Sequence, residues 1–371
     1  MKKRLIGLAL LGILLGGCQA NTTKTCLWTE TDIGRQYIGQ DGIPVTGWQE
    51  IDGKHYYFSE AGIPDIGWQE IGGNRYYFLS DGQMALGQLS LDGEEYLMTE
   101  TGLHTGVYEA GGKAVLYDEQ GKLQRNEGMT QFEGHHYYID EGGTLHKGWL
   151  NLFGDEYYFL PSGKMAVGEI RIGEEIYHFS PHGIRVLLVN PWNRIPGDYE
   201  VELTDWEGGF HVAAECFEPL RQMLADCREA GLNPKPVSAY RTREDQQLLY
   251  ENRIQRWMRQ GYSRKEATAL AGKSVAVPGT SEHQLGLAVD IVDEKYQNLD
   301  RKQADTATQK WLLQHCWEYG FILRYPSDAG EITGIIYEPW HYRYVGKAIA
   351  MEMKELGITL EEYLGAIQAV G

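Results

Sequence analysis

The chain has 371 residues, with 34 Lys and Arg against 52 Asp and Glu, so its formal net charge is −18. This length predicts two or three domains. A hydrophobic content of 42% excludes wholesale disorder, because it can fill real cores. The acidic balance argues against a nucleic-acid partner, since phosphate binding requires clustered Lys and Arg. Glycine is unusually frequent, and 24 of the 46 glycines lie in residues 47–183.

The first residues have the pattern of an export signal. Residues 2–4 are Lys-Lys-Arg, and the apolar run at 5–15 is too short to span about 30 Å of hydrocarbon as a helix. Leu-Gly-Gly-Cys at 15–18 resembles a bacterial lipobox. This resemblance implies that residues 1–17 are removed and that a lipid on Cys18 holds the protein at the outer face of the membrane. The alternative is an ordinary secretory signal with an incidental cysteine.

Four further cysteines follow, and their spacing matches no CxxC zinc pattern. An exported protein can form disulfides, but buried free thiols fit the sequence equally well. The residues are Cys26, Cys216, Cys227 and Cys316.

Residues 31–185 repeat with a period of about 20 residues. A glycine begins each unit, and an aromatic cluster such as Tyr56-Tyr57-Phe58 follows it. The pattern predicts a β-hairpin in each unit, with turns such as Asp52-Gly53. Because one hairpin cannot bury its own aromatic face, neighbouring hairpins must stack. We therefore expect a β-hairpin solenoid.

These units resemble the choline-binding or cell-wall-binding repeats of Gram-positive surface proteins, with the pattern G-W-x(4)-G-x-x-Y-Y-F. In that family, aromatic cages between adjacent units bind choline by cation–π attraction. Four of the seven units here lack the tryptophan, and stacking on sugars or simple core packing would use the same rings. The resemblance implies cages lined by Trp48, Tyr57, Trp68, Tyr77, Trp149 and Tyr158.

After Gly183 the glycine period stops, and helix signals appear. Short strands are expected at 236–240, 286–292, 321–325 and about 342–345. The pattern predicts an α+β domain of about 180 residues, with a small antiparallel sheet and flanking helices. Helix starts are expected at Pro219 (with Gly231 closing the helix), Thr242 with Asp245, Ser263 with Glu266, Asp305 or Thr306, and Thr359 with Glu362.

Three motifs in this region carry groups suited to metal-assisted hydrolysis. They are Ser-Ala-Tyr-Arg at 238–241, Ser-Glu-His-Gln-Leu-Gly-Leu-Ala-Val-Asp at 281–290 and Glu-Pro-Trp-His at 338–341. A catalytic zinc ion needs three protein ligands and one open position, and these motifs supply two histidines and an aspartate. Read alone, each of these residues has a simpler role in the core or at the surface.

A carboxylate must also accept a proton in such a reaction, and Glu338 lies three residues before His341. Positions i and i+3 of a regular strand point to opposite faces. Glu338 and His341 therefore need a bend between them, for which Pro339 is suited.

Taken together, residues 186–365 resemble the zinc D-Ala-D-Ala carboxypeptidases of the vancomycin-resistance type. The motifs SxYR, SxHxxGxAxD and ExxH occur in that order, although Ala239 and Thr242 stand where Gly and Ser are commoner. The resemblance implies roles for seven residues: zinc ligation by His283, Asp290 and His341, general base and acid catalysis by Glu338, and substrate binding by Arg241, Ser281 and Gln246.

The predicted organisation is a signal peptide at 1–17, a linker at 18–30, a solenoid at 31–185 and a zinc peptidase domain at 186–371. The main hypothesis is a surface enzyme that removes C-terminal D-Ala from peptidoglycan stem peptides. Its repeats would bind a wall polymer, either choline-bearing teichoic acid or glycan. An L,D-carboxypeptidase acting on tetrapeptides, a binding protein with a vestigial peptidase domain and a choline-anchored adhesin are the alternatives.

Overall fold

The structure is a computed structural model that describes residues 26–197 and 199–366. The signal peptide predicted at 1–17 and the predicted lipid attachment at Cys18 therefore lie outside the described residues. The chain divides into two compact units, Met1–His146 and Lys147–Gly371. This division falls two hairpins before the point at which the repeat pattern ends. No helix in the described ranges has the length and apolar composition that crossing a bilayer requires.

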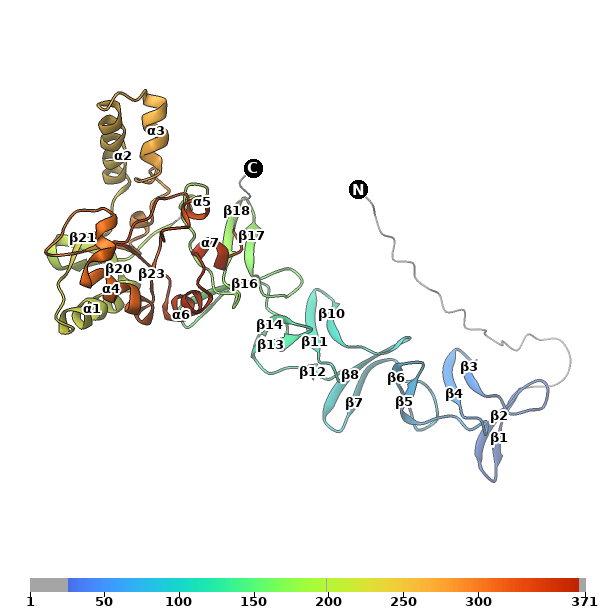
Figure 1. Ribbon diagram of the computed structural model, residues 1–371. Helices are drawn as coiled ribbons and strands as arrows, with labels where there is room; N and C mark the ends of the chain where they lie inside the picture. Colours follow the sequence, from blue (N-terminus) through green and yellow to red (C-terminus); the bar gives the residue numbers. More distant parts are fainter. Residues whose placement is uncertain (1–25, 198, 367–371) are drawn as a thin grey trace. The chain divides into compact units, whose positions relative to one another are not determined.

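The first unit consists of antiparallel hairpins, each labelled by its strands in Figure 1. The pairs are β1 (Leu27–Thr31) with β2 (Gly34–Ile38), β3 (Gly47–Ile51) with β4 (Lys54–Phe58), β5 (Gly67–Ile71) with β6 (Asn74–Phe78), β7 (Gly87–Leu91) with β8 (Glu94–Thr99) and β9 (Gly102–Leu103), β10 (Gly106–Ala110) with β11 (Lys113–Tyr117) and β12 (Leu123–Gln124), and β13 (Gly128–Phe132) with β14 (His135–Ile139).

The hairpin turns and their stacking confirm the solenoid expected from the sequence. Asp52 and Gly53 have φ of 55° and 71°, and this left-handed pair is what a two-residue type I′ turn requires. Between neighbouring hairpins, Trp28 packs against the buried Phe58 of the next unit. Each hairpin thus buries the aromatic face of its neighbour, because a two-stranded ribbon has no second layer of its own.

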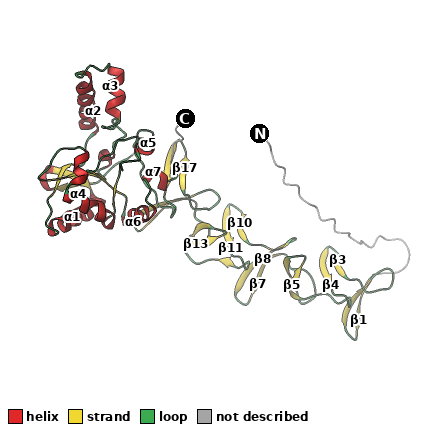
Figure 2. Cartoon of the chain, in the orientation of Figure 1, coloured by secondary structure: helices red, strands yellow, loops and turns green. Residues whose placement is uncertain are grey.

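The second unit begins with two more hairpins, β15 (Gly148–Leu152) with β16 (Asp155–Phe159) and β17 (Gly168–Ile172) with β18 (Glu175–Phe179). After these hairpins the chain forms helices as well as strands, and Figure 2 shows the helices of this unit in red. They are η1 (Glu207–Gly209), α1 (Ala214–Glu229), α2 (Arg243–Met258), α3 (Arg264–Gly272), η2 (Glu282–Leu285), η3 (Arg301–Asp305), α4 (Ala307–His315), η4 (Cys316–Tyr319), α5 (Gly330–Thr333), α6 (Lys347–Leu356) and α7 (Leu360–Tyr363).

A four-stranded antiparallel sheet forms the centre of the α+β part. Its order is β21-β22-β24-β23, and a separate hairpin joins β19 (Leu203–Trp206) to β20 (Phe210–Ala213). The strands of the sheet are β21 (Pro234–Ser238), β22 (Ala288–Asp293), β24 (His341–Tyr344) and β23 (Phe321–Leu323). All four strands predicted from the sequence are present, each within two residues of the predicted start and end. Helix α1 packs on this sheet in a core that includes three buried free thiols, Cys216 and Cys227 on α1 and Cys316 on η4.

Most helix starts agree with the sequence. Thr242, Ser263 and Thr359 each form a capping box, and Thr306 caps α4. The start predicted at Pro219 is wrong, because α1 begins at Ala214. Backbone hydrogen bonds from Ala213 to Gly286 and from Ala214 to Glu202 anchor that earlier turn. Tertiary contacts therefore override the local preference of proline for the first turn.

We expect Leu220→Ala to lower the free energy of unfolding of the second unit by about 2–5 kcal/mol, because Leu220 is buried in the core on α1. Leu248→Ala on α2 is the matched control, since that side chain is 63% exposed and its loss should cost less than about 0.5 kcal/mol. Denaturant unfolding of the three proteins measures both values. Equal effects of the two substitutions would contradict this core assignment.

Candidate metal centre

Two neighbouring strands and one 3₁₀ turn position the three residues predicted as zinc ligands. Asp290 on β22 pairs directly with His341 at the start of β24, so their side chains share one face of the sheet. His283 lies in η2, which ends at Gly286 with a φ of 75°. A side chain at Gly286 would come within 2.9 Å of the Ala213 nitrogen, so only glycine lets the chain turn here from η2 into β22.

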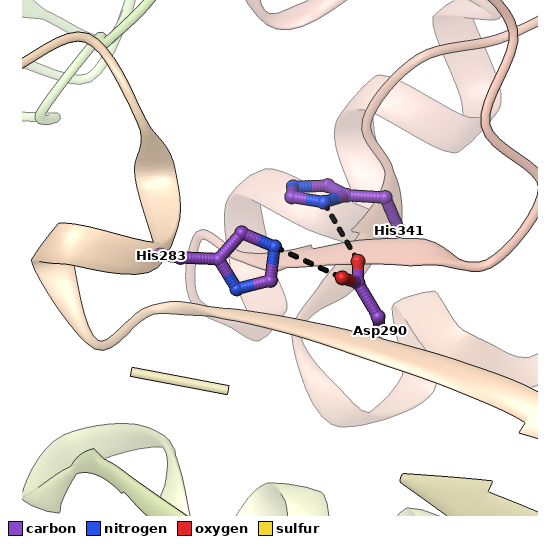
Figure 3. Close-up of side chains that lie close together, drawn as sticks. All are labelled: His283, Asp290 and His341. Atoms are coloured by element: carbon purple, nitrogen blue, oxygen red, sulfur yellow. Dashed lines mark hydrogen bonds and ion pairs between the residues drawn. The ribbon is translucent and has the colours of Figure 1, made fainter. Parts of the chain in front are cut away.

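The three side chains converge on one point, as Figure 3 shows. Asp290 Oδ2 lies 3.2 Å from His283 Nε2, and Asp290 Oδ1 lies 3.1 Å from His341 Nδ1. The candidate ligand atoms all lie within 4.8 Å of one another, and all three residues are buried. The structure therefore brings together the metal ligands that the sequence predicted.

Each imidazole uses its other nitrogen to fix its orientation. His283 Nδ1 donates a hydrogen bond to the Ala239 carbonyl oxygen at 2.7 Å, which leaves Nε2 facing Asp290. His341 Nε2 lies 3.3 Å from Glu282 Oε2, which leaves Nδ1 facing Asp290. Such outer partners are typical of metal-binding histidines. Two imidazole nitrogens and one carboxylate oxygen are the protein ligand set of a catalytic zinc site, which keeps its fourth position for a water or substrate.

The charges in the site also suit a cation. Burial lowers the pKa of His283 to about 4, with the Arg241 charge acting in the same direction. Burial would lower the pKa of His341 as well, but the hydrogen bonds to Asp290 and Glu282 outweigh it and raise this pKa to about 9. Asp290 thus attracts positive charge at the position that a divalent ion would take, and Glu282 attracts it on the other side of the His341 ring.

Glu282 belongs to a buried ionic cluster that the sequence reasoning missed. Its Oε1 accepts hydrogen bonds from Arg324 Nε at 2.7 Å and from Arg343 Nη1 at 2.9 Å. Burial would raise the pKa of Glu282, but the two guanidinium groups outweigh it and hold the pKa well below its usual range. Arg324 Nη1 also donates to Glu361 on α7 at 2.9 Å, and Glu361 accepts a hydrogen bond from Asn190 at 3.0 Å.

The general base expected from the sequence, Glu338, precedes β24 in a tight turn. The His341 amide donates to the Glu338 carbonyl oxygen at 3.1 Å across Pro339-Trp340. This turn is the bend that the spacing of Glu338 and His341 required. Burial raises the pKa of Glu338 to about 8, and the Asp290 charge adds to it against His341, Arg241 and Arg253. Burial thus makes this carboxyl group a weaker acid than an ordinary glutamic acid side chain.

The structure places Arg241 against the metal ligands. Arg241 Nη2 donates to Asp290 Oδ2 at 3.0 Å, Nη1 to Gln246 Oε1 at 3.0 Å and Nε to Ser238 Oγ at 3.0 Å. Gln246 is fully buried and also donates to the Ala276 carbonyl oxygen at 2.7 Å, so it holds the guanidinium in place. Ser281 is buried directly before the η2 turn that carries His283.

The aromatic residues predicted as cages lie in the repeat hairpins. Each tryptophan meets the second tyrosine of its own hairpin edge to face, with ring centroids 5.3 Å apart for Trp48 and Tyr57 and 5.2 Å apart for Trp68 and Tyr77. The centroids of Trp149 and Tyr158 lie 5.1 Å apart.

We expect Glu282→Gln to weaken zinc binding by about 10–100-fold, because the amide removes the charge that orients His341. Glu331→Gln, at an exposed glutamate of α5, should bind zinc as the parent chain does. Competition with a metal chelator measures the affinities, and circular dichroism checks that both variants are folded. An unchanged affinity in folded Glu282→Gln would contradict the proposed role of this carboxylate.

Both parts of the chain are similar to known proteins. The family model for VanY, D-alanyl-D-alanine carboxypeptidase, matches residues 209–347. The "Putative cell wall binding repeat" model matches 46–63 and 66–84. A D-alanyl-D-alanine carboxypeptidase of Enterococcus faecalis is 41% identical over 48% of this chain, which spans 65% of that relative. "Putative carboxypeptidase YodJ" of Bacillus subtilis is 34% identical over 49% of this chain and 68% of its own length.

Among solved structures, a zinc complex of the vancomycin-resistance D,D-pentapeptidase VanY is similar, with 41% identity over 48% of this chain and 97% of that chain at a TM-score of 0.45. Choline binding protein F of Streptococcus pneumoniae is 25% identical over 44% of this chain and 58% of its own, at a TM-score of 0.35. On the family model and the sequence relatives, this chain belongs to the VanY family of D-alanyl-D-alanine carboxypeptidases.

Proposed function

We propose that the protein is a zinc-dependent carboxypeptidase that removes the C-terminal D-Ala from peptidoglycan stem peptides. The observation that carries this proposal is the convergence of His283, Asp290 and His341 beside the buried Glu338. Membership of the VanY family supports the choice of a peptide ending in D-Ala. A missing metal ligand would support the vestigial-domain hypothesis, and none of the three candidate ligands is missing.

The metal and Glu338 have different roles in the proposed hydrolysis. When bound, zinc acts as a Lewis acid and lowers the pKa of a coordinated water toward neutrality. Glu338 would accept a proton from the attacking water as the water oxygen bonds to the peptide carbonyl carbon. It would then donate this proton to the nitrogen of the leaving D-Ala as the C–N bond breaks. Burial raises the pKa of this carboxyl group to about 8, and the charge of a bound zinc ion would lower it toward the operating pH.

Arg241 contributes positive charge next to the reacting groups. Three of its N–H groups are engaged with Asp290, Gln246 and Ser238, and a guanidinium has five. The remaining donors are available to an anionic group of the substrate, its terminal carboxylate or the carbonyl oxygen as charge develops on it. Ser281 lies beside His283 and is assigned to the same substrate end.

The location we propose is extracytoplasmic, at the cell wall. The chemistry proposed for the metal centre has its substrate there, and the repeats resemble cell-wall-binding units. Binding of the repeats to wall polymer would raise the local concentration of stem peptides around the enzyme. We also propose that a lipid on Cys18 anchors the protein to the outer face of the cell membrane and that the organism is a Gram-positive bacterium.

Glu338→Gln should lower the rate of D-Ala release from a pentapeptide by about 10²–10⁴-fold, because the amide cannot accept the proton. Zinc content should stay at one ion per chain, since Glu338 is not a ligand. Glu355→Gln at an exposed position of α6 is the control and should keep full activity. Parental activity in zinc-loaded Glu338→Gln would show that another group is the base.

Digests of paired substrates separate the two carboxypeptidase hypotheses. We expect the protein to convert pentapeptide stems to tetrapeptides and to leave tetrapeptide stems unchanged, as mass spectrometry of the products would show. Tripeptide products from the tetrapeptide would instead establish L,D-carboxypeptidase activity at the same metal centre.

A further inference from the structure

Two arginine side chains from separate segments of the second unit meet over one glycine. A Cβ atom placed on Gly279 would lie 3.3 Å from Arg243 Nη1 and 3.7 Å from Arg194 Nη1. Gly279 is buried and has a φ of 88°, so glycine is required here and also lets the two guanidinium groups approach the backbone. Both arginine side chains are exposed, so a ligand can reach the point at which they meet.

Hydrogen bonds hold the backbone around this pair of arginines. The Ile195 amide donates to the Gly279 carbonyl oxygen at 2.9 Å, which fixes the segment that carries Arg194. The Gly279 amide donates to Gln284 Oε1 at 2.8 Å. Arg243 is the first residue of α2, and a capping box fixes the start of that helix. Three anchored segments therefore keep the two guanidinium groups together.

In the described part of the chain, the two guanidinium groups have no anionic partner. Nine other arginines there form ion pairs with carboxylates, whereas Arg194 and Arg243 form none. The acids that follow Arg243 are Glu244 and Asp245, and the Asp245 carboxylate accepts hydrogen bonds from Thr242 instead. Two like charges at one point repel each other, and an anion bound between them would remove this repulsion.

The pair lies close to the metal centre along two short stretches of chain. Arg243 follows Arg241 by two residues, and Gly279 precedes His283 by four. Since an extended chain spans at most about 3.6 Å per residue, the backbone at Gly279 lies within about 14 Å of that at His283. An extended substrate peptide covers this distance in about four residues. The pair is therefore within reach of a peptide whose scissile bond lies at the metal.

The part of the substrate that the pair can meet follows from the chemistry of a carboxypeptidase. Arg241 donates to the candidate ligand Asp290, whereas the guanidinium groups of the pair lie over Gly279. The substrate ends one residue beyond the scissile bond, so a subsite farther from the metal meets its N-terminal side. A guanidinium group binds a carboxylate through two parallel hydrogen bonds. The group that fits the pair is thus a carboxylate ahead of the scissile bond.

We propose that Arg194 and Arg243 form a subsite for a free carboxylate of the stem peptide, on a residue ahead of the scissile bond. The enzyme then prefers stems in which this group is a carboxylate over stems in which it is an amide. The inference rests on the carboxypeptidase function proposed above and adds the class of stem peptide that is cleaved best. Because the contact is remote from the reacting atoms, it stabilises substrate and transition state alike and acts on KM rather than on kcat.

Hydrolysis of two matched pentapeptides by the full-length, zinc-loaded protein tests the subsite. Both end in Lys-D-Ala-D-Ala, and the residue before lysine is γ-linked D-Glu with a free α-carboxylate in one peptide and an α-amide in the other. We expect kcat/KM to be about 10-fold higher for the carboxylate, through a lower KM, because hydrogen bonds between charged groups have this strength.

The outcomes of this comparison separate the subsite from the proposed function. Equal kcat/KM values for two peptides that are both cleaved would overturn the subsite alone, and would point to an anionic wall polymer as the partner of the pair. Cleavage of neither peptide would overturn the proposed function and the subsite with it.

Substitution of the pair assigns the preference to these two side chains. Arg194→Gln combined with Arg243→Gln should abolish the preference for the carboxylate. Arg259→Gln combined with Lys265→Gln is the matched control and should keep it. The control removes the same charge from two exposed residues, and Arg259 follows Arg243 by about 24 Å along the helix axis. A parental preference in the folded Arg194 and Arg243 variant, or its loss in the control, would overturn the assignment.

A reversed preference provides the sharper test, because misfolding cannot produce it. Arg194→Glu combined with Arg243→Glu should make the amide peptide the better substrate, since carboxylates beside Gly279 would repel the free carboxylate of the other peptide. Arg259→Glu combined with Lys265→Glu should keep the preference of the parent chain. An unchanged preference in the first variant would contradict the subsite.

Discussion

The metal centre depends on burying the carboxylate of Asp290 without leaving its charge unpaired. Both oxygens are occupied, since Oδ1 faces His341 and Oδ2 faces His283 and Arg241. Burying an isolated carboxylate would cost several kcal/mol. The charged Asp290 side chain is stable here because two strands and a 3₁₀ turn place cationic or polarisable groups next to it. The β22–β24 register provides His341, and the Gly286 turn provides His283. A divalent cation would also pair with the Asp290 charge, and the side chains that would bind it are already oriented.

The same constraint extends outward through Glu282. This buried carboxylate orients His341 and is in turn neutralised by Arg324 and Arg343, and Arg324 continues to Glu361 on α7. Helix α7 is thereby joined to the candidate ligand His341 through charge-assisted hydrogen bonds, which are stronger than neutral ones. The repeats use arginine differently, because there the guanidinium groups of Arg35 and Arg75 lie over the rings of the half-buried Trp28 and Trp68.

Local signals in the sequence predicted much of this structure. The 20-residue period defined the hairpins, and the capping boxes at Ser263 and Thr359 located helices. The ordered motifs identified the three residues that converge as candidate metal ligands. The start of α1 and the role of Glu282 could not be predicted in this way. Both depend on partners far away in the chain, such as Gly286 for the start of α1 and Arg324 for Glu282. Likewise, Arg185 gave no sign that it lies over Trp149, because the packing of the next hairpin places it there.

The central claim is that two imidazoles and one carboxylate, already oriented by the fold, bind the catalytic metal. Anomalous scattering at the zinc edge from crystals of the zinc-loaded protein tests it most directly. The account predicts one strong peak at about 2.0–2.2 Å from His283 Nε2, from an Asp290 oxygen and from His341 Nδ1. A peak elsewhere, ligation through His341 Nε2 or no peak at saturating zinc would contradict the account.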